Sequence, residues 1–166
     1  MGEGLKLLSG GLHFVHVGTS GFIAASEDLF NGSPATDIVN MENFTEVVFI
    51  VSKVAGGTGT ATATMESCDT VVPGTATEIN FWYRACTTPD VWGAITAAVA
   101  ATGVPITAGA DQQWLFGVRS EGLSGTDKYV RLKLTETEST AVDGSVACIM
   151  AGGRFVREIT PVTVLV

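Results

Sequence analysis

The sequence predicts an all-β fold, an antiparallel β-sandwich or barrel. Three observations support this prediction: short segments rich in β-branched and aromatic residues recur along the chain, turn-forming residues separate them, and no repeating helical segments lie between them. The length of 166 residues fits a single domain, since one domain typically takes about 100–200 residues.

The first two expected strands cover residues 46–54 and 59–67. Residues 46–54 form a β-branched and aromatic run, whereas threonine and alanine alternate from Thr60 onward. The turn signal Gly56-Gly57 separates the two segments. We therefore expect them to pair as a hairpin with one polar face.

The remaining expected strands have similar length and composition. They cover residues 78–84, 112–119, 129–135 and 145–151. In the third of these segments, Val130, Leu132 and Leu134 fall on one face of a strand, whereas Arg131 and Lys133 fall on the other. That alternation is typical of a half-buried strand.

An alanine-rich segment, residues 90–101, is the best candidate for a helix. It also contains β-branched residues, so a helix and a strand are equally consistent with it. The longest apolar stretch, residues 91–104, overlaps it and is interrupted by glycine and threonine. Because a membrane-spanning helix needs about 20 apolar residues, we expect a soluble protein without a membrane span.

The first 11 residues differ in composition from the rest of the chain. They hold four glycines together with Leu5, Leu7 and Leu8. This composition predicts a flexible N-terminal arm over residues 1–11, which orders only against another surface. The β-sandwich domain is then expected over residues 12–166. A secretory signal would need a basic start and a continuous apolar stretch, so we expect the protein to be made in the cytoplasm.

The carboxyl end, residues 159–166, is an apolar, strand-like stretch that includes Val162, Val164 and Val166. Two interpretations are open for it. The segment joins a sheet of its own domain, or a neighbouring chain covers it, because an exposed apolar edge strand is an aggregation hazard.

The composition indicates that part of the surface needs a partner. Hydrophobic residues make up 46% of the chain and charged residues 16%, against about 25% charged residues in typical soluble domains. Nine basic and seventeen acidic residues give a net charge of −8. That charge argues against nucleic acid as the main ligand, since such binding depends on Lys and Arg neutralising phosphates.

Residue types that carry chemistry are few and scattered. His13 and His16 are three residues apart, which places them on opposite faces of a strand and weakens them as a metal pair. The three cysteines, Cys68, Cys86 and Cys148, lack the spacing of a zinc site and are expected to be reduced and packed as small apolar groups. We assign no catalytic, cofactor-binding or metal-binding residues and no cofactor, and we expect the protein not to be an enzyme.

Two binding possibilities stay open. Four acidic residues lie in expected loops: Asp111, Glu121, Asp127 and Asp143. They lack the spacing of a calcium-binding loop, although residues from separate loops could still assemble a calcium site. The aromatic residues Trp82, Tyr83, Trp92 and Trp114 favour a place in the sandwich core, with a sugar-stacking platform as the alternative.

Several segments together resemble small structural proteins encoded in the head modules of tailed bacteriophages. These segments are residues 37–69, 79–84, 129–134 and 151–157. The resemblance implies a virion protein, a capsid decoration or cement protein on the outer shell. It also implies a jelly-roll-like β-sandwich, a homo-oligomer that is often a trimer, and the major capsid protein as partner.

On this interpretation the protein stabilises a capsid shell by binding it, without catalysis, nucleic acid or membrane. The oligomer or capsid contacts are expected at the two ends of the chain. The residues concerned are Leu5, Leu7, Leu8, Val162, Val164 and Val166. Two alternatives remain: a phage tail or fibre component, and a carbohydrate-binding β-sandwich that uses its tryptophans.

Overall fold

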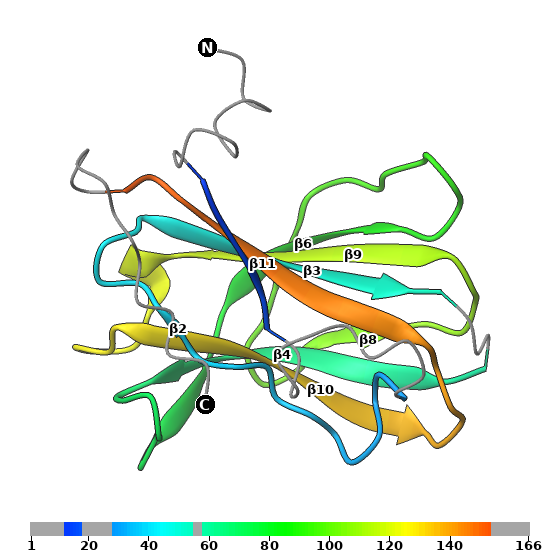
Figure 1. Cartoon of the computed structure of the whole chain (residues 1–166), viewed down its shortest axis with the longest axis horizontal. Helices are drawn as coiled ribbons and strands as arrows, with labels where there is room; N and C mark the ends of the chain where they lie inside the picture. Colours follow the sequence, from blue (N-terminus) through cyan, green and yellow to red (C-terminus); the bar gives the residue numbers. More distant parts are fainter. Residues whose placement is uncertain (1–11, 18–27, 55–57, 154–166) are drawn as a thin grey trace.

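The computed structural model describes residues 12–17, 28–54 and 58–153. These residues form two antiparallel sheets that pack face to face, as predicted (Figure 1). The larger sheet has six strands in the order β1-β11-β3-β9-β6-β7. Their bounds are β1 His13–His16, β3 Glu46–Lys53, β6 Phe81–Cys86, β7 Thr96–Ala98, β9 Gln112–Arg119 and β11 Gly144–Ala151.

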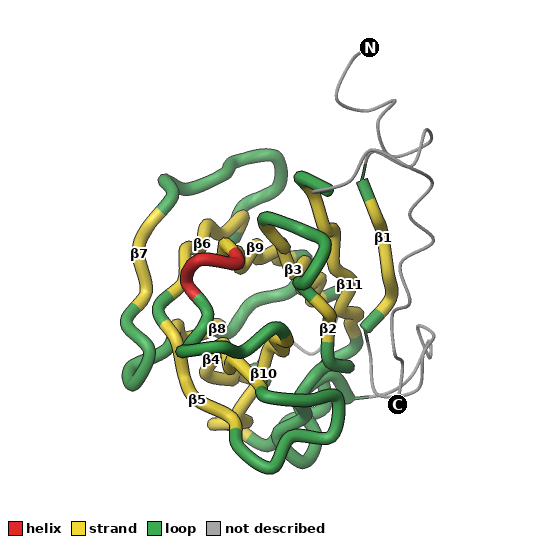
Figure 2. The backbone as a smooth tube through the Cα atoms, turned by 90° about the vertical axis from the view of Figure 1, so that its left-hand side faces the viewer, coloured by secondary structure: helices red, strands yellow, loops and turns green. Residues whose placement is uncertain are grey.

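The smaller sheet has five strands. Its order is β2-β10-β4-β5, and β8 also pairs with β4, beside the half of that strand that β5 leaves open. The bounds are β2 Val39–Asn40, β4 Thr60–Cys68, β5 Ala76–Ile79, β8 Val104–Ile106 and β10 Tyr129–Glu138. Figure 2 shows the two layers end-on, with β1 and β7 at opposite edges of the larger sheet.

Eight of the strands have the wrapped order of a jelly roll. β1 pairs with β11, β2 with β10, β3 with β9 and β4 with β5, so the first strand meets the last and the middle strands meet each other. β11 then joins β3, and β10 joins β4. The other three strands, β6, β7 and β8, are inserted between β5 and β9, and β6 and β7 extend the larger sheet.

The core lies between the sheets and is built by side-chain alternation. On β3, Val47, Phe49 and Val51 are buried, and each faces inward between partly exposed neighbours. Phe116 of β9 is fully buried and pairs across the strands with Phe49. Its ring centroid lies 6.0 Å from that of Phe81, edge to face. This aromatic group holds the centre of the larger sheet against the smaller one.

The predicted hairpin over residues 46–67 is wrong. β3 and β4 both form, but β3 belongs to the larger sheet and β4 to the smaller one, so the connection between them crosses from one sheet to the other. The physical reason is that both strands bury one face in the shared core: Phe49 from β3 and Met65 from β4 are fully buried. Placing them in opposite layers lets the two apolar faces meet.

The segment expected as one strand over residues 78–84 is two strands. β5 ends at Ile79 and β6 begins at Phe81, in different sheets, so the chain changes layer at Asn80. The Asn80 side chain accepts a hydrogen bond from the backbone N–H of Ala100, 2.9 Å away, which holds this corner. In the alanine-rich segment, a strand forms over Thr96–Ala98, and no α-helix occurs in the described part of the chain.

The two ends of the described chain lie at one corner of the larger sheet. His13 of β1 pairs with Met150 of β11, so Leu12 and the residues after Ala151 adjoin each other. The six residues expected to make assembly contacts, Leu5, Leu7, Leu8, Val162, Val164 and Val166, lie outside the described residues. The segments that carry them are nevertheless attached at this shared corner.

Candidate functional site

The three cysteines are free and buried, as predicted; they are Cys68, Cys86 and Cys148. Burial raises the pKa of the Cys148 thiol from 9.0 to about 12. Burial also raises the pKa of Cys68 to about 11, although the nearby Arg131 guanidinium opposes the shift. Because the thiolate is the reactive form of cysteine, Cys68 and Cys148 pack as apolar groups and are poor nucleophiles.

We expect the buried thiols to weaken the fold at alkaline pH. A thiol whose pKa is raised in the folded state adds stability below pH 9, and this stability is lost as the pH rises toward the folded pKa. Between pH 9 and 10.5, Cys148 alone should lower the free energy of unfolding by about 2 kcal/mol, at about 1.4 kcal/mol per pH unit. Urea unfolding across this pH range measures the slope.

A Cys148→Ala variant is the control, because it removes this titration and keeps that of Cys68. Its free energy of unfolding should fall less steeply with pH than that of the wild-type protein. Equal slopes for the two proteins would contradict the assignment.

The histidines and the acidic loop residues do not come together as a metal-binding cluster in the described part of the chain. His13 and His16 lie on β1, and the His13 ring stacks at 6.2 Å from Phe44. Burial lowers the pKa of His13. Within residues 12–17, 28–54 and 58–153, no group of three or more His, Cys, Asp or Glu side chains is placed to hold a metal ion.

Lys53 is buried at the end of β3, only 1% exposed. Its ammonium group donates to the carbonyl oxygens of Gly59, at 2.6 Å, and Thr107, at 3.0 Å. Burial lowers the pKa of Lys53. These bonds join the ends of three strands in both sheets, so Lys53 acts as a structural clamp between the layers.

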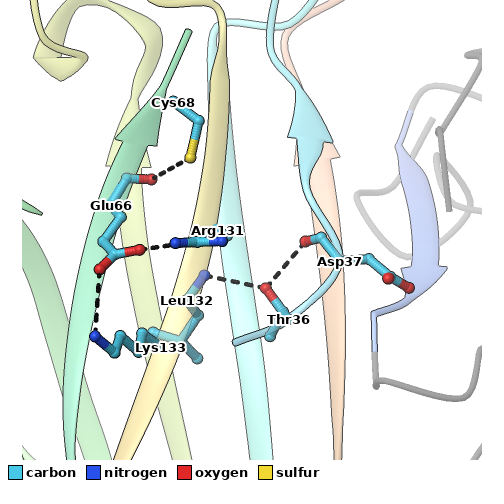
Figure 3. Close-up of polar contacts among 7 residues, drawn as sticks. All are labelled: Thr36, Asp37, Glu66, Cys68, Arg131, Leu132 and Lys133. Atoms are coloured by element: carbon cyan, nitrogen blue, oxygen red, sulfur yellow. Dashed lines mark hydrogen bonds and ion pairs between the residues drawn. The ribbon is translucent and has the colours of Figure 1, made fainter. Parts of the chain in front are cut away.

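The outer face of the smaller sheet is polar, and Glu66 forms ion pairs with two basic residues of β10. Glu66 is almost fully buried there, and its carboxylate lies 2.6 Å from Arg131 and 3.7 Å from Lys133 (Figure 3). The Thr36 hydroxyl accepts a hydrogen bond from the N–H of Leu132 and donates one to the carbonyl of Asp37, each at 3.0 Å. The Thr36 contacts bind the segment before β2 to β10.

The outer face of the larger sheet is different, because apolar residues occupy it as well as the core face. Two rows of these residues run across the strands. The first crosses β1, β11, β3 and β9 through Phe14, Ile149, Val48 and Gly117. The second crosses β11, β3 and β9 through Ala147, Ile50 and Leu115. Phe14 is 42% exposed, Ala147 is buried, and the other apolar residues in these rows are half-buried. We call Phe14, Ala147, Ile149, Val48, Ile50 and Leu115 the apolar face. An antiparallel sheet that faces water on one side usually has polar residues there.

The structure separates the three tryptophans. Trp114 is buried in the core and stacks on Phe116 at 6.3 Å, as predicted. The core interpretation is wrong for Trp82, which points out from β6 and is 57% exposed. Trp92 is partly exposed, with the Arg84 guanidinium 5.1 Å from its ring centre. The alternation of β6 could have indicated this, because Phe81 and Tyr83 take the inward positions and leave Trp82 outward.

Trp82 lines a groove on the outer face of the larger sheet. The groove has a volume of about 630 Å³, within the range of roughly 300–1,000 Å³ that is typical of ligand sites. Glu46, Val48, Asn80, Trp82, Ile95, Gly117, Arg119 and Glu121 are among its lining residues. The inserted strands therefore supply part of a concave site that the eight-stranded jelly roll alone would lack.

Exposed apolar residues also concentrate in the inserted segment. The large hydrophobic residues exposed there are Trp82, Val91, Ile95 and Val99, at 57%, 61%, 67% and 62%. The sequence over residues 90–101 is equally consistent with a helix and a strand, so it does not indicate which of its apolar residues are exposed. Segments inserted into a common fold often carry the functional site of the protein.

Comparison with protein-family models, with curated proteins and with solved structures finds no match. No helix in the described part of the chain is both long enough and apolar enough to cross a membrane.

Proposed function

We propose that this protein is a non-enzymatic structural protein of a tailed-phage virion, which binds the assembled capsid shell as a decoration or cement protein. The observation that carries the proposal is the apolar face: a sheet of a small, acidic domain presents two rows of apolar side chains outward. Such a face favours a protein partner, because burial of apolar area stabilises association by about 25 cal/mol per Å².

The position of the chain ends supports the same assignment. The segments that carry Leu5, Leu7 and Leu8, and Val162, Val164 and Val166, are attached beside Phe14 and Ile149 at the β1–β11 corner. Contacts from both ends and from the apolar face can therefore act on one partner surface. From the resemblance of the sequence to phage head proteins, we propose the major capsid protein or a second copy of the chain as that partner.

A cement protein stabilises a shell by mass action, since it binds the assembled lattice and not the separated subunits. An oligomer that engages several lattice sites gains avidity, so each contact can be modest. We propose a homotrimer on the capsid surface. Light scattering should then give a mass of about 52 kDa, three times the 17.2 kDa of one chain.

Co-sedimentation with phage heads assembled without this protein tests capsid binding. The wild-type protein should sediment with heads, and Ile149→Glu should weaken binding by about tenfold or more, because a carboxylate would be buried in the apolar interface. Thr77→Glu is the matched control: it adds the same charge to the exposed strand β5 of the other sheet and should bind normally.

Deletion of residues 1–11 and, separately, of residues 159–166 tests whether the two chain ends make oligomer or capsid contacts. Each deletion should reduce the oligomer mass or the binding to heads. A wild-type protein that is monomeric and stays in the supernatant would contradict the proposal. Binding to isolated tails and not to heads would instead support the tail or fibre alternative.

A further inference from the structure

We infer that the groove beside Trp82 is a binding site for neutral saccharides. This activity goes beyond capsid binding. It rests on the residues that line the groove between β3, β9, β6 and the segment before β7, of which only Val48 also belongs to the apolar face. The inference rests on the shape of the groove, on its aromatic wall and on the chemistry of its polar rim.

The wall and floor of the groove suit the apolar face of a sugar ring. Trp82 lies directly opposite Gly117 in the β6–β9 pair, and Gly117 lies opposite Val48 in the β9–β3 pair. The missing side chain at Gly117 leaves open space beside the exposed indole. A pyranose ring can enter this space with its C–H groups against the indole, and Ile95 lines the same groove.

The rim of the groove supplies both hydrogen-bond donors and hydrogen-bond acceptors. Arg119 and Glu121 lie 3.6 Å apart, with side chains 72% and 79% exposed. An exposed pair of this kind holds together weakly, so both groups can turn to ligand hydroxyls. The oxygen of the Asn80 side chain accepts from Ala100, which leaves its NH₂ group as the donor it can offer. Sugar hydroxyls both donate and accept, and they match this mixture.

The charge of the lining argues for a neutral ligand. Two carboxylates, Glu46 and Glu121, accompany one guanidinium, Arg119. A phosphate, a sulfated glycan or a nucleic acid would meet a net negative charge in the groove. A purely apolar partner would remove three charged groups from water without a replacement for their hydration, which is costly.

The backbone around the groove argues against a peptide that extends the sheet. The positions at the floor, Val48, Gly117 and Trp82, lie on strands that are paired on both sides. A peptide strand needs a free sheet edge for its main-chain hydrogen bonds. A ligand in this groove must therefore bind through side chains and ring faces, as a saccharide does.

The test is a glycan array that displays neutral and acidic glycans, followed by titration of the best neutral binder with calorimetry. The wild-type protein should bind at least one neutral glycan, and Trp82→Ala should weaken that binding by about tenfold or more. Gly117→Val should weaken it as much by filling the floor. A Cβ at Gly117 would lie 3.4 Å from Val48 and 3.5 Å from the Val47 carbonyl, which is ordinary contact, so this variant should fold.

Trp92→Ala is the matched control, because Trp92 belongs to the same inserted segment but does not line the groove. It should retain full binding, and circular dichroism should show that all three variants are folded. The inference is overturned if the wild-type protein binds no neutral glycan, if it binds only acidic glycans, or if binding survives both Trp82→Ala and Gly117→Val. Binding of Ile149→Glu to phage heads reports on the proposed function separately, because Ile149 does not line the groove.

Discussion

A Phe116→Ala variant is expected to lose about 3–5 kcal/mol of its free energy of unfolding, a large part of the stability of a domain of this size. Phe116 is fully buried at the centre of the larger sheet. It packs edge to face on Phe81 at 6.0 Å and stacks on Trp114 at 6.3 Å. Truncation removes these contacts and leaves a cavity that the two sheets can fill only partly.

Urea unfolding followed by tryptophan fluorescence measures this loss, since Trp114 lies beside the altered residue. Val72→Ala is the control, because Val72 is 71% exposed and its truncation should change stability by less than about 0.5 kcal/mol. A loss below about 1 kcal/mol for Phe116→Ala would mean that the centre of the sandwich lies elsewhere.

A Gly144→Ala variant is expected to lose about 3 kcal/mol, although it adds only one methyl group. Gly144 begins β11 opposite Lys53 of β3. A Cβ at this position would collide with the carbonyl oxygen of Ser52 and lie 2.7 Å from a methyl group of Leu29. The first obstacle is backbone, so the strands themselves must move apart.

Gly74→Ala is the matched substitution in open space, where the nearest atom to the new Cβ is an Asp69 carboxylate oxygen at 3.7 Å. Its thermal midpoint should stay within a few degrees of the wild-type value. Equal midpoints for Gly144→Ala and Gly74→Ala would show that β11 and β3 do not approach as closely as described.

The strands were predictable because alternation and β-branched runs are local signals. Residues 112–119 were expected as a strand and form β9 with the same bounds, and Val130, Leu132 and Leu134 are buried as expected. Which strands pair was not predictable. A glycine turn between two strands looks the same whether the chain makes a hairpin or crosses to the other sheet, and only the common core decides between them.

The candidate sites were predictable only in part. The apolar face follows from the continuous run over Val47–Val51, in which both faces of one strand are apolar, a pattern typical of a strand covered on both sides. The groove depends on Gly117 and Trp82 meeting across two strands that are far apart in sequence. Residue types alone favoured the core for Trp82, since aromatic residues are buried more often than exposed.

We propose that the apolar face binds the capsid. Hydroxyl-radical footprinting of the protein, free and bound to phage heads, tests whether this face becomes covered. Oxidation of Phe14 and Ile149 is expected to fall on binding, whereas oxidation of Val72, which is 71% exposed, is expected to stay unchanged. Equal oxidation of Phe14 and Ile149 in the free and bound protein, or protection confined to the smaller sheet, would contradict the claim.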